Sequence, residues 1–346
     1  MSPLVHTLLL ISLFTTTLIT MMSHHWLLAW LSLELNMLSI IPLMMKPLHP
    51  RATEAAIKYF LIQTFASTLI VFSSILNAWQ TGQWTITLTP TPLATTLLTI
   101  AIMVKLGVAP THLWYIEVLQ GVTMNMALLI TTWQKLAPLT LLYLTVNQLP
   151  MNIIITLGAV STVLGGFIGL NQTQMRKIMA CSSISHMGWL IITLNANPQL
   201  MTLTLLLYII LTTTTFNILS TTKTTSLLDL GTAWATSPTR MVLMMATLMS
   251  LGGIPPLTGF LPKLLILKNL ISLNLIPLAT MMALASLPSL FFYLRMFYLT
   301  TITSPPNTTT TEYKWRFKTP QLPSAATLSI TSVLILPIAP LLYNTT

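Results

Sequence analysis

Long apolar runs, separated by short polar or proline-containing breaks, dominate the pattern of this chain. Most runs approach about 20 residues, the length that an α-helix needs to cross the hydrocarbon core of a bilayer. The short alternating segments that mark the strands of a membrane β-barrel are absent from the pattern. It therefore predicts an all-α, polytopic membrane helix bundle with eleven candidate helices. These span about residues 3–22, 25–45, 56–79, 93–120, 124–146, 150–170, 174–194, 199–222, 240–271, 275–301 and 324–343.

Two of the predicted helices are interrupted by glycine and proline. The first interruption is Lys105-Leu106-Gly107-Val108-Ala109-Pro110, and the second is Leu251-Gly252-Gly253-Ile254-Pro255-Pro256-Leu257-Thr258-Gly259. Proline removes a backbone donor and clashes with the preceding turn, while glycine lets the chain turn freely. Such breaks either shape packing alone or expose backbone groups to an ion site. Because Lys105 and Lys263 adjoin the two breaks, we favour an ion site, with Pro110, Pro255 and Pro256 as supporting residues.

The distribution of basic residues predicts the topology. The loops after the second, sixth, eighth and tenth predicted helices contain Lys or Arg, whereas those after the odd-numbered helices up to the ninth contain neither. This alternation indicates an N-terminus on the basic side, which is the matrix or the cytoplasm, and a C-terminus on the opposite side. The loop 302–323 is the one long polar segment and is predicted to contact neighbouring chains on the basic side. The basic loop residues are Lys46, Arg51, Lys58, Arg176, Lys177, Lys223, Arg240, Lys314, Arg316 and Lys318.

The composition agrees with a membrane protein. Only 6% of the residues are charged, 54% are hydrophobic and the mean hydropathy is +0.80, so the chain cannot form an ordinary soluble surface. The net charge of +10 would suggest nucleic acid in a soluble domain. Here no Arg-rich patch or aromatic stacking platform accompanies it, and topology explains it better. No nucleic-acid partner is predicted.

Neither a redox centre nor a metal site is predicted within the chain. A single cysteine, Cys181, excludes an internal disulfide, an iron–sulfur site and a cysteine-based zinc site. No histidine–carboxylate spacing suggests another metal site. Gly165, Gly166 and Gly169 follow no predicted strand and lack the dinucleotide-binding spacing, so nicotinamide binding is not predicted. They suit close helix packing instead.

Four ionisable residues lie within otherwise apolar runs and are the candidate catalytic residues for proton transfer: Glu34, Lys105, Lys135 and Lys263. With a rise of about 1.5 Å per residue, Glu34 lies about 13 Å, Lys105 about 18 Å and Lys135 about 16 Å into its helix, close to the midplane of the bilayer. The depth of Lys263 depends on how its helix continues after the break. Placing a charged side chain at this depth costs several kcal/mol, about 3 on insertion scales. A residue kept there at such a cost is therefore a candidate for function.

Glu34 and Lys105 suggest a proton-pumping pair. If they approach within about 4 to 6 Å, the carboxylate stabilises the lysine charge, and separation of the two releases a proton. A static salt bridge that holds the helices in register is the alternative. One carboxylate cannot neutralise three lysines, so Lys135 and Lys263 make better sense as titrating relay stations joined by water.

Histidines provide candidate intermediates. His112 and His186 can accept and donate protons near neutral pH, although each can equally be a hydrogen-bonded packing residue. Glu117, after the first break, suits a salt bridge or an entrance for protons. His24 and His25 adjoin a tryptophan at a helix start, where an interfacial anchor is the simpler interpretation.

The chain resembles the chain 2 family of mitochondrial NADH:ubiquinone oxidoreductase, respiratory complex I, over essentially its whole length. Five segments carry the resemblance. They are His25-Trp26-Leu27-Leu28-Ala29-Trp30 through Glu34-Leu35-Asn36, His49-Pro50-Arg51-Ala52 through Lys58-Tyr59-Phe60, Lys105-Leu106-Gly107 through Pro110-Thr111-His112-Leu113-Trp114, Ser185-His186-Met187-Gly188-Trp189, and Gly252-Gly253-Ile254-Pro255-Pro256 through Gly259-Phe260 and Lys263.

The resemblance implies a single antiporter-like transmembrane domain over residues 1–346, built from two inverted repeats with one discontinuous helix each. Animal members lack three N-terminal helices of their bacterial relatives, which agrees with eleven helices. The proton-path residues of the family correspond to Glu34, Lys105, Lys135 and Lys263, which match in type.

The resemblance also implies a location and partners. The chain would be a multi-pass protein of the inner mitochondrial membrane with its N-terminus in the matrix and its C-terminus in the intermembrane space. It would lie among other membrane-arm and accessory subunits and phospholipids such as cardiolipin. NADH, FMN, iron–sulfur clusters and ubiquinone would bind other subunits, and this chain would contribute to proton translocation without redox chemistry of its own.

Two alternatives stay open. A subunit of a multisubunit cation/proton antiporter has the same helix pattern and buried lysines. A structural membrane scaffold would use the same charges as assembly contacts. Replacement of Lys135 by alanine distinguishes the scaffold from the pump. A scaffold would assemble less well but pump normally, whereas a pump would assemble but transfer protons poorly.

Overall fold

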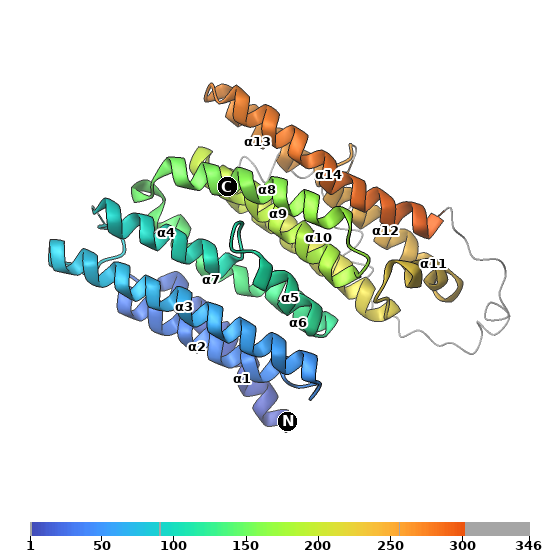
Figure 1. Ribbon diagram of the computed structural model, residues 1–346, viewed down its shortest axis with the longest axis horizontal. Coiled ribbons are helices and arrows are strands. Elements are labelled where there is room, and N and C mark those ends of the chain that lie inside the picture. Colours follow the sequence, from blue (N-terminus) through green and yellow to red (C-terminus); the bar gives the residue numbers. More distant parts are fainter. Residues whose placement is uncertain (1, 90, 256, 302–346) are drawn as a thin grey trace. The chain divides into compact units, whose positions relative to one another are not determined.

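A computed structural model describes residues 2–89, 91–255 and 257–301, which Figure 1 traces in colour. In these ranges the backbone is helical, with turns and two isolated bridge pairs but no β-strand. The prediction of an all-α bundle is confirmed. The predicted helix 324–343, the predicted loop 302–323 and Pro256 lie outside the described residues.

The chain divides into two compact units, the first ending at Val160 and the second beginning at Ser161. The first unit contains α1 (Pro3–Met22), α2 (Trp26–Met44), α3 (Pro50–Thr81), α4 (Pro92–Leu106), α5 (Leu113–Gly121), α6 (Met124–Thr131), α7 (Trp133–Thr145) and the 3-10 helix η1 (Val146–Gln148). The unit boundary falls within α8 (Met151–Leu170). The second unit contains α9 (Met175–Ala196), α10 (Pro198–Thr222), α11 (Leu227–Thr236), α12 (Pro238–Gly252), α13 (Phe260–Ser272) and α14 (Ile276–Thr301).

Seven of the described helices are long and apolar enough to cross a membrane, namely α1, α2, α3, α8, α9, α10 and α14. Several of the others are shorter pieces of runs that the sequence presents as one helix, because breaks divide them. The predicted count of eleven membrane helices stays a prediction.

Helix α3 begins earlier than the apolar pattern indicates. Pro50 occupies its first turn, where a missing N–H costs nothing, and His49 caps it by accepting a hydrogen bond from the backbone N–H of Arg51 at 3.2 Å. Arg51 and Lys58 therefore lie in the first turns of α3, and their assignment to the preceding loop is wrong. Polar residues in the first turns of this helix conceal its start from a search for apolar runs.

Close helix packing in the second unit depends on three glycines of α8. A Cβ on Gly165 would lie 2.7 Å from the backbone nitrogen of Ser185 in α9, and one on Gly169 would lie 2.8 Å from the ring of Phe292 in α14. A Cβ on Gly166 would meet Pro288 of α14 at 3.1 Å. The predicted role of this cluster in packing is confirmed, since each position faces a neighbouring helix.

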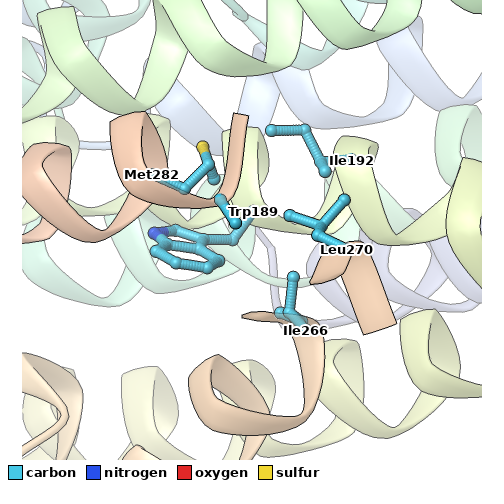
Figure 2. Close-up of a cluster of buried hydrophobic side chains, with 6 residues drawn as sticks. Trp189, Ile192, Ile266, Leu270 and Met282 are labelled. Atoms are coloured by element: carbon cyan, nitrogen blue, oxygen red, sulfur yellow. The ribbon is translucent and has the colours of Figure 1, made fainter. Parts of the chain in front are cut away.

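A buried apolar cluster holds α13 in the second unit (Figure 2). Trp189 and Ile192 of α9 meet Ile266 and Leu270 of α13, with Met282 of α14 against them. Burying side chains of this size is worth about 1.5 to 3 kcal/mol each in water, although in a bilayer the gain comes from dispersion contacts instead. The cluster anchors the helix that begins just after the second break.

Helix α11 was not predicted, because its ten residues are too few for a membrane span. A local sequence signal defines it nonetheless. Ser226 caps the helix, and the Asp229 carboxylate accepts hydrogen bonds from the backbone N–H groups of Thr225 at 2.9 Å and Ser226 at 2.8 Å and from the Thr225 hydroxyl at 2.8 Å. These donors, the Ser226 N–H above all, lower the pKa of Asp229 from 3.8 to about 2.

We expect Asp229→Ala to speed amide exchange in α11 about threefold to tenfold at pH 7, because three donors lose their acceptor. Since the folded-state pKa is lowered, the stabilisation by Asp229 is fully present above about pH 4 and is lost as the pH falls through about 2. Hydrogen exchange of peptides covering residues 225–236 measures the effect. Thr232→Ala is the matched control, because the Thr232 hydroxyl bonds only within the helix, to the carbonyl of Asp229. Equal protection in both variants would contradict the prediction.

Candidate proton-transfer site

The first predicted break is confirmed. Helix α4 ends at Leu106, Gly107 adopts the left-handed conformation with φ 69°, and α5 begins only at Leu113. The N–H of Gly107 bonds to the carbonyl groups of the last α4 turn. A Cβ at Gly107 would also lie 3.1 Å from the Cβ of Tyr115. The break therefore requires glycine, and it leaves Lys105 in the last turn of a half-helix.

The second break, in the other unit, repeats the same local structure. Helix α12 ends at Gly252, Gly253 has φ 80° and caps the last carbonyl groups of α12, and α13 begins at Phe260. Pro255 lies between the two half-helices. The Lys263 ammonium donates a 2.8 Å hydrogen bond to the carbonyl of Gly252. A cation thus neutralises the negative end of a helix dipole at this break.

A third break, which was not predicted, precedes Lys135. The expected continuous helix 124–146 is two helices, α6 and α7, separated at Thr132, where ψ is −68° and φ is −110°. The Thr132 hydroxyl donates to the carbonyl of Leu128 at 2.7 Å, a back-bond that competes with regular helix geometry. No glycine or proline marks this position, so the usual signal for a break is absent. Lys135 lies in the first turn of α7.

Lys105 and Lys135 line one cavity in the first unit. Lys105 is 8% exposed and Lys135 is 4% exposed. The Lys135 ammonium lies 5.0 Å from the centre of the Tyr115 ring, at cation–π distance. The cavity offers about 20 Å³ to the centres of water molecules, and one water needs about 10 to 15 Å³ by this measure. Its wall contains Leu33, Asn36, Met37, Tyr59, Gln63, Lys105, Leu106, Trp114, Tyr115, Ile130, Gln134, Lys135 and Pro138.

Glu34 and Lys105 do not form an ion pair within 4.0 Å in the described part of the chain. The Glu34 carboxylate accepts a hydrogen bond from the hydroxyl of Ser67, and it attracts Lys105 from a longer distance. The Lys105 ammonium instead reaches the carbonyl of Gln63 at 3.5 Å. A static salt bridge is therefore not the observed arrangement. The separation of about 4 to 6 Å between Glu34 and Lys105 stays a prediction.

One ring nitrogen of His112 has a backbone partner. Its Nδ1 lies 3.1 Å from the carbonyl oxygen of Pro110, which can only accept, so Nδ1 carries a proton, and in the neutral imidazole Nε2 then presents a lone pair. The Nε2 atom is buried and has no hydrogen-bond partner in the described structure. His112 thus has an acceptor available for a proton or a water molecule, which the packing interpretation does not require.

In the second unit, His186 and Lys263 line another cavity, which offers about 30 Å³ to water centres. The His186 ring lies 5.6 Å from the ring of Tyr208, which is also in the wall. Ser250 and Gly259, from the two sides of the second break, also lie in this wall. Each unit therefore combines a broken helix, a lysine and a small cavity.

Surface groups take simpler roles. Lys58 forms ion pairs with Glu54 at 2.5 Å and with Glu117 at 2.6 Å, which confirms the salt-bridge interpretation of Glu117. His25 caps α2 through a bond from the N–H of Leu27 and stacks on Trp84. These contacts fix helix ends and are outside the cavities.

Sequence reasoning missed the uncharged polar residues of the first cavity. Asn36, Tyr59, Gln63 and Gln134 all lie in its wall. A usable signal was present, because an amide in an apolar membrane run also needs a partner, and Gln134 directly precedes Lys135. These residues were missed because only charged side chains were considered as candidates in the apolar runs.

Known proteins share this fold. A chain of respiratory complex I from Thermus thermophilus matches with a TM-score of 0.86 at 24% identity, covering 98% of this chain and 78% of that one. A chain of the Mrp complex from Dietzia matches with a TM-score of 0.82 at 17% identity, covering 97% and 75%. These matches show the fold alone.

The sequence comparisons are more specific. Residues 23–289 match the family described as NADH:quinone oxidoreductase/Mrp antiporter, and residues 290–343 match the NADH dehydrogenase subunit 2 C-terminus. The fold and the first match define the class as antiporter-like membrane subunits. The NADH-ubiquinone oxidoreductase chain 2 proteins of Xenopus laevis and Osphranter robustus are each 49% identical to this chain, covering 99% of both sequences. The chain belongs to the NADH-ubiquinone oxidoreductase chain 2 family.

Proposed function

We propose that this chain is a core membrane-arm subunit of respiratory complex I that contributes to proton translocation, coupled to electron transfer from NADH to ubiquinone in other subunits. Family membership supports the assignment to the complex. The observation that carries the proton-transfer role is the first cavity, whose wall contains two buried lysines on broken helices and which has room for water. Buried lysines whose positions depend on helix breaks suit a relay.

The roles of the residues follow from their positions. Glu34 modulates the charge of Lys105 across α2, α3 and α4, and Lys105 exchanges protons with Lys135 through the first cavity. Lys263 performs the corresponding step in the second unit, where the Gly252 carbonyl holds its ammonium. His112 and His186 are supporting residues for proton entry and exit. The chain itself supplies no redox group.

Other subunits, the membrane and lipid surround the chain in the complex. NADH, FMN, iron–sulfur clusters and ubiquinone bind other subunits of the complex. The chain lies in the inner mitochondrial membrane, with its N-terminus in the matrix and its C-terminus in the intermembrane space, in keeping with the basic loops. Anionic phospholipid such as cardiolipin contacts the basic side.

A native gel of the source membrane, extracted in mild detergent, tests the assignment. We expect peptides of this chain in a large band that oxidises NADH, and proton uptake by vesicles that contain the band. The similarity to an Mrp complex makes a cation/proton antiporter subunit the second candidate. Peptides confined to a band without NADH oxidation, together with sodium-dependent proton exchange, would favour that candidate and overturn the proposal.

A further inference from the structure

A chain of three uncharged polar side chains crosses the first cavity. The Gln134 side-chain amide donates to Oδ1 of Asn36 at 3.0 Å, and the hydroxyl of Tyr59 donates to Oε1 of Gln134 at 3.4 Å. The three residues come from α7, α2 and α3, and all of them line the cavity that contains Lys105 and Lys135. This network is separate from the charged residues assigned above.

The two bonds use one donor and one acceptor of the Gln134 amide. Its NH2 group points to Asn36 on α2 and its carbonyl oxygen points to Tyr59 on α3. A primary amide has two N–H donors and an oxygen with two lone pairs. Gln134 therefore keeps one donor and one acceptor lone pair for a further partner in the cavity wall.

Water is the partner that fits. The cavity has room for about one water molecule, and a water molecule needs both donors and acceptors to be held. An amide does not gain or lose a proton near neutral pH, so Gln134 cannot itself be a relay station. A water that it orients can pass a proton between the lysines that share the wall.

The network also connects this water to the helix that carries Glu34. Asn36 follows Glu34 by two residues on α2, and Gln134 directly precedes Lys135 after the break at Thr132. A shift of α2 that moves Glu34 would therefore move the amide as well. This arrangement couples the carboxylate to the connection between the lysines without an ion pair.

We propose that Gln134 is a positioning residue for proton transfer between Lys105 and Lys135, which it serves by orienting cavity water while Asn36 and Tyr59 fix its amide. The inference rests on the proposed proton-transfer function and adds a residue to it. Gln134 touches the water carrier and acts on the lysines only through it.

The test uses the whole complex with Gln134→Met or Tyr59→Phe in this chain, reconstituted in vesicles. Methionine keeps the length of the side chain but removes both polar atoms, whereas phenylalanine removes one hydroxyl at almost constant volume. We expect Gln134→Met to lower the proton translocation rate about fivefold and Tyr59→Phe about twofold, each with a larger solvent isotope effect in D2O. Tyr143→Phe is the matched control on α7, because Tyr143 is exposed and outside the cavity.

A double variant separates positioning from packing. If Gln134 acts through Lys135, adding Gln134→Met to Lys135→Met lowers the rate no further than Lys135→Met alone. Additive losses in the double variant overturn the inference and leave the proposed function standing. The same holds if Gln134→Met and Tyr59→Phe both have wild-type rates while Lys135→Met is impaired. Wild-type rates for Lys135→Met overturn both. If Gln134→Met fails to assemble, the rate and isotope effect of Tyr59→Phe decide.

Discussion

Lys135→Met is expected to lower proton translocation at least tenfold in a complex that still assembles. Lys135 is 4% exposed and lines the cavity that also holds Lys105, so its loss removes one of the two lysines in this cavity wall. Methionine is similarly long and unbranched, and it fills the space of the lysine stem. The substitution replaces a buried charge by an apolar group, so it also removes the cost of desolvating that charge, and we expect the fold to tolerate it. Proton uptake by vesicles, recorded together with NADH oxidation, measures the effect.

The matched control for this experiment is Lys58→Met. Lys58 lies on α3 of the same unit, but its side chain is 38% exposed and pairs with Glu54 and Glu117 outside the cavity. Exposed ion pairs contribute little to stability, so we expect translocation within about twofold of the wild type. Poor assembly of Lys135→Met with a normal rate per assembled complex would instead support the scaffold interpretation.

Local signals made much of the fold predictable. The first helix was predicted at 3–22 and is observed at Pro3–Met22, because an apolar run of suitable length follows a serine cap and an N-terminal proline. The breaks at Gly107 and Gly253 were predictable, since glycine and proline leave a clear trace in the sequence. The start of α3 was missed because polar residues fill its first turns, although Pro50 marks it, and the break at Thr132 was missed because no glycine or proline marks it.

The contacts within the site required the structure. Gln134 is 98 residues from Asn36 and 75 residues from Tyr59, so no local period or spacing could place them together. The depth of Lys135 followed from its place in an apolar run, but its position against the Tyr115 ring depends on helix packing. Sequence thus identifies which groups are costly to bury, and packing decides what each of them meets.

Gly259→Ala is expected to reduce the amount of assembled complex at least about fivefold. Gly259 precedes α13 at the second break, where an added Cβ would overlap the carbonyl oxygen of Ser250 in α12. A backbone atom cannot turn aside as a flexible side chain can, so the two half-helices must separate. Overpacking costs about 1 to 3 kcal/mol, and 1 kcal/mol already changes a folding equilibrium about fivefold.

Gly252→Ala provides a control seven positions away in the same break. An added Cβ there would lie 3.6 Å from the nearest atom of Tyr293, an ordinary contact, and Gly252 ends a helix in which alanine is favoured over glycine. Quantitative native gels of both variants should therefore show near-normal assembly for Gly252→Ala and a loss for Gly259→Ala. Because Gly259 and Ser250 also line the cavity with Lys263, any Gly259→Ala complex that assembles should translocate protons more slowly. Equal assembly and equal rates for the two variants would show that the half-helices are free to move apart, and that the position of Lys263 does not depend on their close approach.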